Sequence, residues 1–189
     1  MAGATITSLK NYFLIAMPSL LDPQFYRTVV YLCEHNEQGC IGIIINQPIS
    51  IILGEVFRQL DIHTDNPLLE KRLVFSGGPV HRERGFILHP AGTLWQNTVE
   101  ISREISLTTS GDILQAIARN EGPPEFLIAL GYVHWDSGQL EKELSENIWL
   151  YGPSNVDIMF HLPIEERWRA AVALLGIDVD KISDDIGHA

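Results

Sequence analysis

Residues 73–80 read Leu73-Val74-Phe75-Ser76-Gly77-Gly78-Pro79-Val80, and they join an apolar segment to an abrupt interruption of regular structure. The first three residues favour a β-strand. Gly77 and Gly78 lack a Cβ atom and Pro79 lacks an amide proton, so the strand is expected to end there in a turn. Glycines in such a turn can point backbone amide groups into a cleft. The stretch therefore predicts a strand that ends in a turn able to contribute to a binding site.

Apolar segments elsewhere in the chain predict the rest of a sheet. Two of them flank a polar, glycine-containing loop at residues 34–39, which is typical of a β-hairpin. Another, residues 126–133, is continuously apolar, as expected for a strand buried on both faces. In chain order the predicted strands are 13–17, 28–33, 41–45, 73–75, 85–88, 105–108 and 126–133.

Helical periodicity separates several of these strands. Within residues 53–60 the apolar side chains recur at the spacing of an amphipathic helix, and further helices are predicted to begin near 112, 137 and 163. Strands and helices are interspersed without strict alternation, and a hairpin is present. We therefore predict an α+β fold with a mixed sheet. We expect one domain over residues 1–189, with a short flexible N-terminus (about 1–10) and an acidic C-terminal tail (about 178–189).

Composition limits the class of protein. The 189 residues are 46% hydrophobic, and no apolar run approaches the ~18 residues of a membrane-spanning helix. There are 13 basic and 24 acidic residues, and a net charge of −11 disfavours direct binding to nucleic acid. The basic residues around the glycine turn, Lys71, Arg72, Arg82 and Arg84, are interpreted as a solvated face. We predict a cytoplasmic protein in which Cys33 and Cys40 are free thiols.

The motifs of the common enzyme classes are absent from the sequence. It has no phosphate-binding loop, no dinucleotide-binding glycine motif, no nucleophile elbow and no His-Glu-x-x-His zinc motif. The histidines have no metal-ligand spacing, so we predict no metal site and no cofactor. Ser76, His81 and Asp136 supply the residue types of a hydrolase triad, but only if the fold brings them together. We therefore assign no catalytic residue.

A second candidate position lies where the buried strand at 126–133 ends. Trp135 and Asp136 leave the strand, and Gln139 and Glu141 lie at the start of the next predicted helix. Aromatic and polar side chains at such an exit can form the lip of a recognition cleft. Alternatively, Trp135 fills the core. The candidate cleft comprises Gly77, Gly78, His81, Trp135, Asp136, Gln139 and Glu141.

Several short motifs occur in a characteristic order along the chain. They are Asp22-Pro23-Gln24-Phe25, Arg27-Thr28-Val29, Asn46-Gln47-Pro48, Gly77-Gly78-Pro79-Val80, Gly131-Tyr132 with Trp135, and Gly138-Gln139-Leu140-Glu141. From about Tyr12 to the C-terminus the chain resembles the YqgE/AlgH family of bacterial proteins. The resemblance implies a compact α+β fold with a strongly coiled, barrel-like mixed sheet flanked by helices. It implies no established biochemical activity, although the family carries a transcriptional-regulator label linked to alginate synthesis.

These observations favour a non-enzymatic binding or regulatory protein of the cytosol that acts through a protein partner. One alternative is a small-molecule-binding protein or hydrolase that uses a cleft near Gly77-Gly78 and Trp135. A direct DNA-binding regulator is a further alternative, but the net charge and the lack of a recognisable helix-turn-helix disfavour it.

Overall fold

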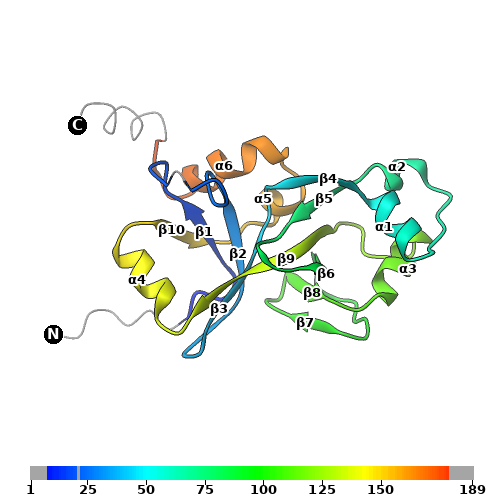
Figure 1. The fold of residues 1–189 in the computed structure, drawn as a ribbon, viewed down its shortest axis with the longest axis horizontal. Helices are drawn as coiled ribbons and strands as arrows, with labels where there is room; N and C mark the ends of the chain where they lie inside the picture. Colours follow the sequence, from blue (N-terminus) through cyan, green and yellow to red (C-terminus); the bar gives the residue numbers. More distant parts are fainter. Residues whose placement is uncertain (1–7, 21, 179–189) are drawn as a thin grey trace.

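The computed structural model describes residues 8–20 and 22–178, and a ten-stranded sheet runs through this part of the chain (Figure 1). Hydrogen bonds connect eight strands in the order β10-β1-β2-β3-β9-β6-β8-β7, while β5 joins β4 to β9 beside this path. The strands are β1 (Tyr12–Ala16), β2 (Val29–Asn36), β3 (Gly39–Ile44), β4 (Pro48–Ile52), β5 (Leu73–Ser76), β6 (Val80–Pro90), β7 (Thr98–Glu100), β8 (Ile105–Thr108), β9 (Leu127–Asp136) and β10 (Trp149–Pro153).

The sheet is mixed and strongly curled. β5 runs parallel to β9, with Phe75 opposite Ala129, whereas the other strand pairs are antiparallel. Its curvature produces a half-barrel that is flanked by helices (Figure 1). The predicted α+β fold with a coiled mixed sheet is confirmed.

Short helices cover the sheet. α1 and α3 pack on its β5–β6–β9 region, α4 lies against β9, β3 and β10, and α6 lies against β1 and β2. The helices are α1 (Leu53–Gln59), α2 (Pro67–Glu70), α3 (Asp112–Ala118), α4 (Gln139–Ser145), α5 (Val156–Phe160), the 3-10 helix η1 (Ile164–Glu166) and α6 (Arg167–Ala173).

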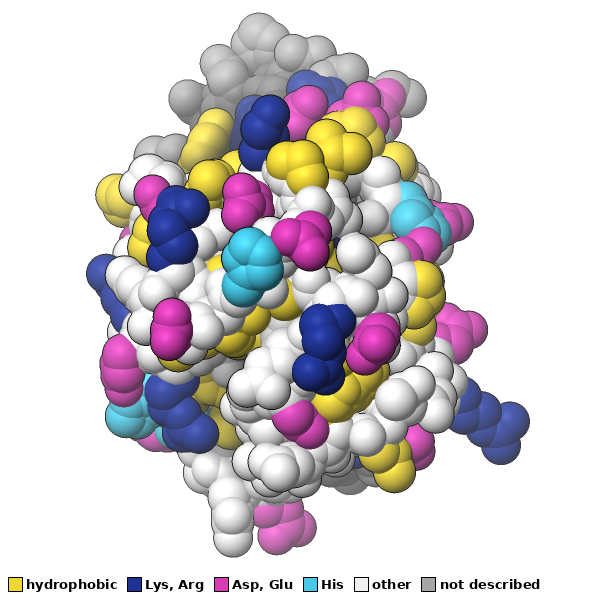
Figure 2. All heavy atoms as spheres, turned by 90° about the vertical axis from the view of Figure 1, so that its right-hand side faces the viewer, with side chains coloured by type: hydrophobic (Ala, Val, Ile, Leu, Met, Phe, Trp, Pro, Cys, Tyr) yellow, Lys and Arg dark blue, Asp and Glu magenta, His cyan; other side chains and the backbone are white. Residues whose placement is uncertain are grey.

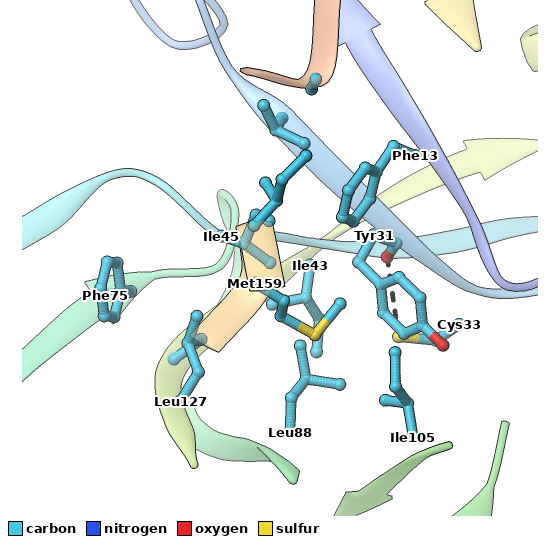
Figure 3. Packing of buried hydrophobic residues seen from close by; sticks show 14 of the residues in the cluster. Phe13, Tyr31, Cys33, Ile43, Ile45, Phe75, Leu88, Ile105, Leu127 and Met159 are labelled. Atoms are coloured by element: carbon cyan, nitrogen blue, oxygen red, sulfur yellow. Dashed lines mark hydrogen bonds between the residues drawn. The ribbon is translucent and has the colours of Figure 1, made fainter. Parts of the chain in front are cut away.

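The inner side of the half-barrel holds the hydrophobic core. Met159 of α5 lies among Ile43, Leu88 and Leu127, which come from three different strands (Figure 3). Met159 and Leu88 are fully buried. Because α5 inserts a long apolar side chain between strands far apart in sequence, it closes the open side of the curl. Cys33 and Cys40 are both buried free thiols, as predicted.

The central strand β9 connects the two halves of the sheet. Its first part, near Ala129, pairs with β5 and β6, and its last part, near Trp135, pairs with β3. Between them Gly131 has a φ of 81°, a left-handed conformation that glycine adopts at low cost. This bend allows one strand to take part in both halves.

Some predicted elements differ from the observed ones. β5 and β6 follow one another in sequence but do not pair, because β5 lies between β4 and β9 instead. β4 was not predicted, and it begins at Pro48, a residue that is tolerated there because β4 pairs with a strand on only one of its sides. α2 and α5 were not predicted, since segments of four and five residues are too short to show periodicity.

A buried polar chain holds the outer strands together. His89 is fully buried, its Nε2 atom lies 2.7 Å from Thr108 Oγ1, and its Nδ1 atom lies 2.9 Å from the Pro90 carbonyl oxygen. The hydroxyls of Thr108 and Thr98 are 2.8 Å apart, and Thr98 Oγ1 accepts the Trp95 amide proton. Every donor and acceptor in this chain is satisfied if the imidazole is neutral and carries its proton on Nδ1. Nδ1 then donates to the Pro90 carbonyl, Thr108 donates to Nε2, and Thr98 donates to Thr108. Burial lowers the pKa of His89, against the opposing effect of the Pro90 carbonyl.

The two expected terminal tails fall mainly on residues 1–7 and 179–189, which lie outside the described residues. At the described N-terminal end, Leu9 is buried and its amide donates to Nδ1 of His35 over 2.8 Å. The other ring nitrogen of His35, Nε2, lies 2.7 Å from Glu141 Oε1. This histidine therefore ties the start of the chain to α4.

Candidate functional site

The glycine turn that was expected to border a cleft is filled by the chain itself. Gly77 and Gly78 are buried, and a Cβ atom built on Gly78 would lie 2.2 Å from the Tyr132 carbonyl carbon. The Gly77 amide donates to the Leu130 carbonyl oxygen over 2.8 Å, and the Gly77 carbonyl accepts the Ile44 amide proton at 2.9 Å. Glycine is required at this crossing because backbone occupies the space of a side chain. The expected open bend is therefore a packed contact with β9.

Trp135 does not form the wall of a cleft either. It is 2% exposed and packs edge-on against Trp149, with ring centroids 6.0 Å apart. Its neighbours include Leu140 of α4, in a second hydrophobic cluster. Trp135 therefore fills the core, as the alternative interpretation of the sequence predicts.

The polar members of the predicted cleft lie at the surface in separate interactions. Gln139 Oε1 accepts the Asp136 amide proton at 3.0 Å, whereas Glu141 pairs with His35. Burial acts to raise the pKa of Glu141, but hydrogen bonds, chiefly from His35, outweigh it and hold the pKa below its ordinary value. His81 is exposed, with Nδ1 3.2 Å from Glu83 Oε1. These contacts organise local structure and do not converge on a common space.

The hydrolase triad is not assembled. Ser76 lies opposite Leu130 on β9, and Asp136 is six residues further along the same strand, beyond the bend at Gly131. Asp136 lies 3.5 Å from the His134 ring nitrogen Nδ1, and His81 interacts with Glu83. The histidine and the aspartate of the candidate triad therefore have other partners, and the hydrogen bonds of a proton relay are not formed between them.

A different hollow has the features of a binding site. It has a volume of about 530 Å³ and opens between β5, the start of β9 and the segment from α5 to α6. Its lining includes Arg72, Arg167, Phe75, Phe126, Phe160 and His161, and we call it the arginine pocket. The volume lies within the range of about 300–1,000 Å³ that is typical of ligand sites.

Arg167 forms the inner end of the arginine pocket. It is only 7% exposed, and its Nη1 and Nε atoms donate to the carbonyl oxygens of Ile45 and Leu162 at 2.5 and 3.1 Å. Its guanidinium carbon lies 5.4 Å from the centre of the Phe75 ring. Burial, and secondarily the positive charge of Arg72, lower the pKa of Arg167 to about 10, so it remains charged at neutral pH. The charge is therefore fixed in an apolar setting.

Arg72 supplies a second guanidinium to the same pocket. Its Nη2 atom donates to the Phe126 carbonyl oxygen over 3.0 Å, and its guanidinium carbon lies 4.3 Å from the centre of the Phe126 ring. Burial lowers its pKa as well. Within residues 8–20 and 22–178, no carboxylate forms an ion pair with Arg72 or Arg167. The negative charge of Glu165 acts on Arg167 and opposes the lowering of its pKa, but it does not form an ion pair with it. Two neighbouring cations that lack an ion-pair partner among these residues make this a site suited to an oxyanion.

The one carboxylate on the lining of the arginine pocket is already engaged. Glu125 Oε1 makes a short contact with His161 Nε2, and His161 Nδ1 lies 2.7 Å from Asp157 Oδ1. The hydrogen bond to Glu125, followed by that to Asp157, raises the pKa of His161. None of the described residues that line the pocket is a serine, threonine or cysteine. The arrangement can hold an anion against aromatic rings, but it offers no hydroxyl or thiol nucleophile.

Sequence reasoning missed this pocket, although two signals pointed to it. The sequence predicts that Arg72 belongs to a solvated face, and the residue is exposed, but its guanidinium also lies over the Phe126 ring at the rim of the pocket. Arg167 lies four residues before Ala171, on the apolar face of the last helix, where an arginine is unusual. A basic residue in an apolar stripe is thus the pattern that would have predicted the site.

Within the described part of the chain, no group of three or more His, Cys, Asp or Glu side chains is placed to hold a metal ion. The same residues include no helix long and apolar enough to cross a membrane.

Fold and pocket together define a small α+β protein with a curled mixed sheet and an arginine-lined hollow at its edge. The chain belongs to the AlgH-like family, whose model (DUF179) matches residues 13–180. Among curated proteins, a UPF0301 protein of Thioalkalivibrio sulfidiphilus is 50% identical over 183 residues, covering 97% of this chain and 98% of the relative. A UPF0301 protein of Saccharophagus degradans is 47% identical over 188 residues, covering 100% of this chain and 92% of the relative.

Solved structures agree with this assignment. The solution structure of the AlgH protein from Pseudomonas aeruginosa is 46% identical, covers 100% of both chains and has a TM-score of 0.80. A crystal structure of protein DIP2367 from Corynebacterium diphtheriae is 17% identical, covers 87% of this chain and 85% of that one, and has a TM-score of 0.71. The second likeness shows a shared fold alone. The family resemblance read from the motifs is confirmed, and it brings no specific activity with it.

Proposed function

We propose that this protein is a non-enzymatic binding module of the cytosol, and that it acts by holding an anionic group of a protein partner in the arginine pocket. The observation that carries the proposal is the pair Arg72 and Arg167, which line one hollow and form no ion pair with a carboxylate of the described residues. The chain as a whole has a net charge of −11, so this local concentration of positive charge runs against its composition.

The energetics support a role in binding. Two like charges near one another and partly removed from water destabilise the folded state, and the lowered pKa of Arg167 reflects that cost. An oxyanion placed between them would relieve the repulsion. Each charge-assisted hydrogen bond is worth roughly 1.5–3 kcal/mol. Arg167 is also held rigidly by two backbone carbonyl groups, so little side-chain entropy would be lost on binding.

Catalysis is the weaker reading of the same residues. The hydrolase alternative depended on Ser76, His81 and Asp136, whose interactions lie in separate places. Direct DNA binding is disfavoured by charge, and on the face shown in Figure 2 basic and acidic side chains are interspersed. A small molecule that carries a carboxylate or phosphate would use the same two arginines. It is therefore the alternative to an anionic group of a protein partner.

The test is isothermal titration of the purified protein with blocked acidic peptides, with benzoate and with inorganic phosphate. Arg72→Gln is the informative variant because its side chain is less buried than that of Arg167. Loss of one charge-assisted contact predicts affinity about tenfold weaker. Arg103→Gln, an exposed arginine outside the pocket, is the matched control and is expected to bind as the wild type does.

Binding that is insensitive to Arg72→Gln, or absence of binding by every anion at millimolar concentration, would overturn the proposal. Tighter binding of peptides than of benzoate and phosphate would support a protein partner. The opposite order would assign the pocket to a small anionic molecule.

A further inference from the structure

A second hollow adjoins the arginine pocket. It has a volume of about 500 Å³, and its lining includes Tyr26, Arg27, Asn46 and Trp168; we call it the Arg27 hollow. Leu73 and Ile164 line both hollows, so the two adjoin along these residues, and we call them together the joined hollows. An extended ligand that crosses Leu73 and Ile164 would contact both.

The backbone at Arg27 is held in an unusual conformation. Its φ is 50°, in the left-handed region that residues other than glycine seldom adopt. The Asn46 side chain fixes it from both sides, because Nδ2 donates to the Arg27 carbonyl oxygen and Oδ1 accepts the Val29 amide proton, each over 2.9 Å. Strained backbone that the surroundings over-determine is frequent at ligand clamps.

The Arg27 side chain is positioned over aromatic rings. Its guanidinium carbon lies 5.0 Å from the centre of the Trp168 ring and 5.4 Å from that of Tyr26. Trp168 is itself immobilised, since it is 3% exposed and its Nε1 atom donates to the Ala16 carbonyl oxygen over 2.9 Å. No carboxylate among the described residues forms an ion pair with Arg27. A guanidinium stacked in this way presents its free edge to an incoming anion.

The charges along the joined hollows point to the chemistry of the ligand. Among the described residues, the acidic lining residues are Glu125 and Glu165, and the basic ones are Lys71, Arg72, Arg167 and Arg27, together with Arg169, which already has an interaction of its own. Over the whole chain the proportion is reversed, with 24 acidic and 13 basic residues. Between the arginines the lining is apolar and partly exposed, since Leu73 is 45% exposed and Tyr26 is 46% exposed. The joined surface thus alternates cation, apolar patch and cation.

We infer that the joined hollows bind an extended acidic peptide segment, with one carboxylate in the arginine pocket, a second at Arg27 and an apolar side chain over Leu73 between them. This inference rests on the proposed function and names the kind of partner that the site accepts. A small anion can contact only one position at a time, and the buried Arg167 makes the arginine pocket the stronger of the two. Two anchors on one chain are what distinguish a peptide ligand from a free carboxylate or phosphate.

The experiment measures the fluorescence anisotropy of labelled, end-blocked hexapeptides that carry two aspartates separated by one to four residues, with leucine between them. In the peptide whose aspartate spacing gives the tightest binding, replacing either aspartate by asparagine is expected to weaken binding. This comparison uses the unaltered protein. Arg27→Gln is expected to weaken binding of the two-aspartate peptide about threefold to fivefold, as for a partly exposed ion pair. It should leave binding of benzoate unchanged.

The outcomes separate the inference from the proposed function. If Arg72→Gln weakens binding but neither Arg27→Gln nor the second aspartate matters, the peptide inference is overturned and the anion pocket stands. If Arg72→Gln also has no effect, both fail. Support requires a double-mutant cycle in which the effect of Arg27→Gln disappears when the peptide has lost the corresponding aspartate. Near-ultraviolet circular dichroism of each variant confirms that the fold is retained.

Discussion

A Cβ atom on Gly77 would lie 2.2 Å from the carbonyl oxygen of Gly131. The two glycines belong to segments more than 50 residues apart, and their backbones touch where the halves of the sheet meet. The Gly77 amide and carbonyl groups bond to Leu130 and Ile44, one on each side of this seam. The glycine turn is thus a structural joint.

Gly77→Ala is expected to destabilise the fold strongly, because a methyl group cannot be accommodated without moving backbone. Overpacking of this kind usually lowers the free energy of unfolding by about 1–3 kcal/mol. Because the added methyl group would meet the Gly131 backbone and not a flexible side chain, we expect a loss at the upper end of this range. Urea unfolding followed by circular dichroism measures the effect. Gly85→Ala is the control, since nothing lies within 4 Å of its added Cβ, and it should change the free energy of unfolding by less than about 1 kcal/mol. If both substitutions destabilised the protein equally, the close backbone contact between Gly77 and Gly131 would not be the cause of the loss.

Trp135→Ala is expected to destabilise by about 3–5 kcal/mol, the usual cost of truncating a large core side chain. Trp135 is buried against Trp149, so the substitution leaves a cavity that the surroundings cannot fill. Thermal unfolding gives the result, and Asp136→Asn, at an exposed neighbouring position, should leave the melting temperature nearly unchanged. A normal melting temperature for Trp135→Ala would show that this residue is not part of the core.

His35→Leu is expected to cost roughly 1–3 kcal/mol, because it leaves the buried Leu9 amide without its acceptor. Glu141→Gln keeps an acceptor for Nε2 of His35 and should cost less than about 1 kcal/mol. Hydrogen exchange of the Leu9 amide provides a local readout alongside urea unfolding. Unchanged protection of that amide in His35→Leu would refute the tie between the start of the chain and His35.

His89 should make the free energy of unfolding depend on pH. Its folded-state pKa lies below the ordinary value of about 6.5, so the unfolded chain binds the proton more readily. The contribution of neutral His89 to the free energy of unfolding is therefore complete above about pH 6.5. It is lost as the pH falls toward the folded-state pKa, and the free energy of unfolding changes by at most about 1.4 kcal/mol per pH unit. His89→Gln should flatten the curve between pH 7 and 5, whereas His63→Gln, an exposed histidine, serves as the matched control. An unaltered slope in His89→Gln would show that the buried chain around Thr108 does not require a neutral ring.

Much of the fold follows from local pattern. The hairpin of β2 and β3 and the buried β9 are visible in the sequence because alternating or continuous apolar residues determine which faces are buried. The parallel pairing of β5 with β9 is not visible, since it joins segments separated by about 50 residues and depends on three glycines meeting in space. The sequence predicts that Gly77 and Gly78 end a strand where only glycine fits, and it leaves open a second role in ligand binding. The structure shows a packed contact with β9 at these glycines.

The candidate site was harder to predict than the fold. Arg72 and Arg167 are 95 residues apart, and neither belongs to a motif with a fixed spacing. Their proximity arises only after β5 pairs with β9 and α6 packs on β1 and β2. By contrast, Trp135 looked like a recognition residue because aromatic side chains at strand ends occur both in clefts and in cores, and periodicity alone does not separate the two.

The central position of β9 has a consequence for synthesis of the protein. β3, β5 and β6 all pair with this strand, yet all three leave the ribosome before it does. Until residues 127–136 emerge, the nascent chain therefore carries unpaired strand edges, the kind of surface on which chaperones act. Closure of the half-barrel is a late, long-range event, and translation through β9 sets the earliest moment at which it can occur.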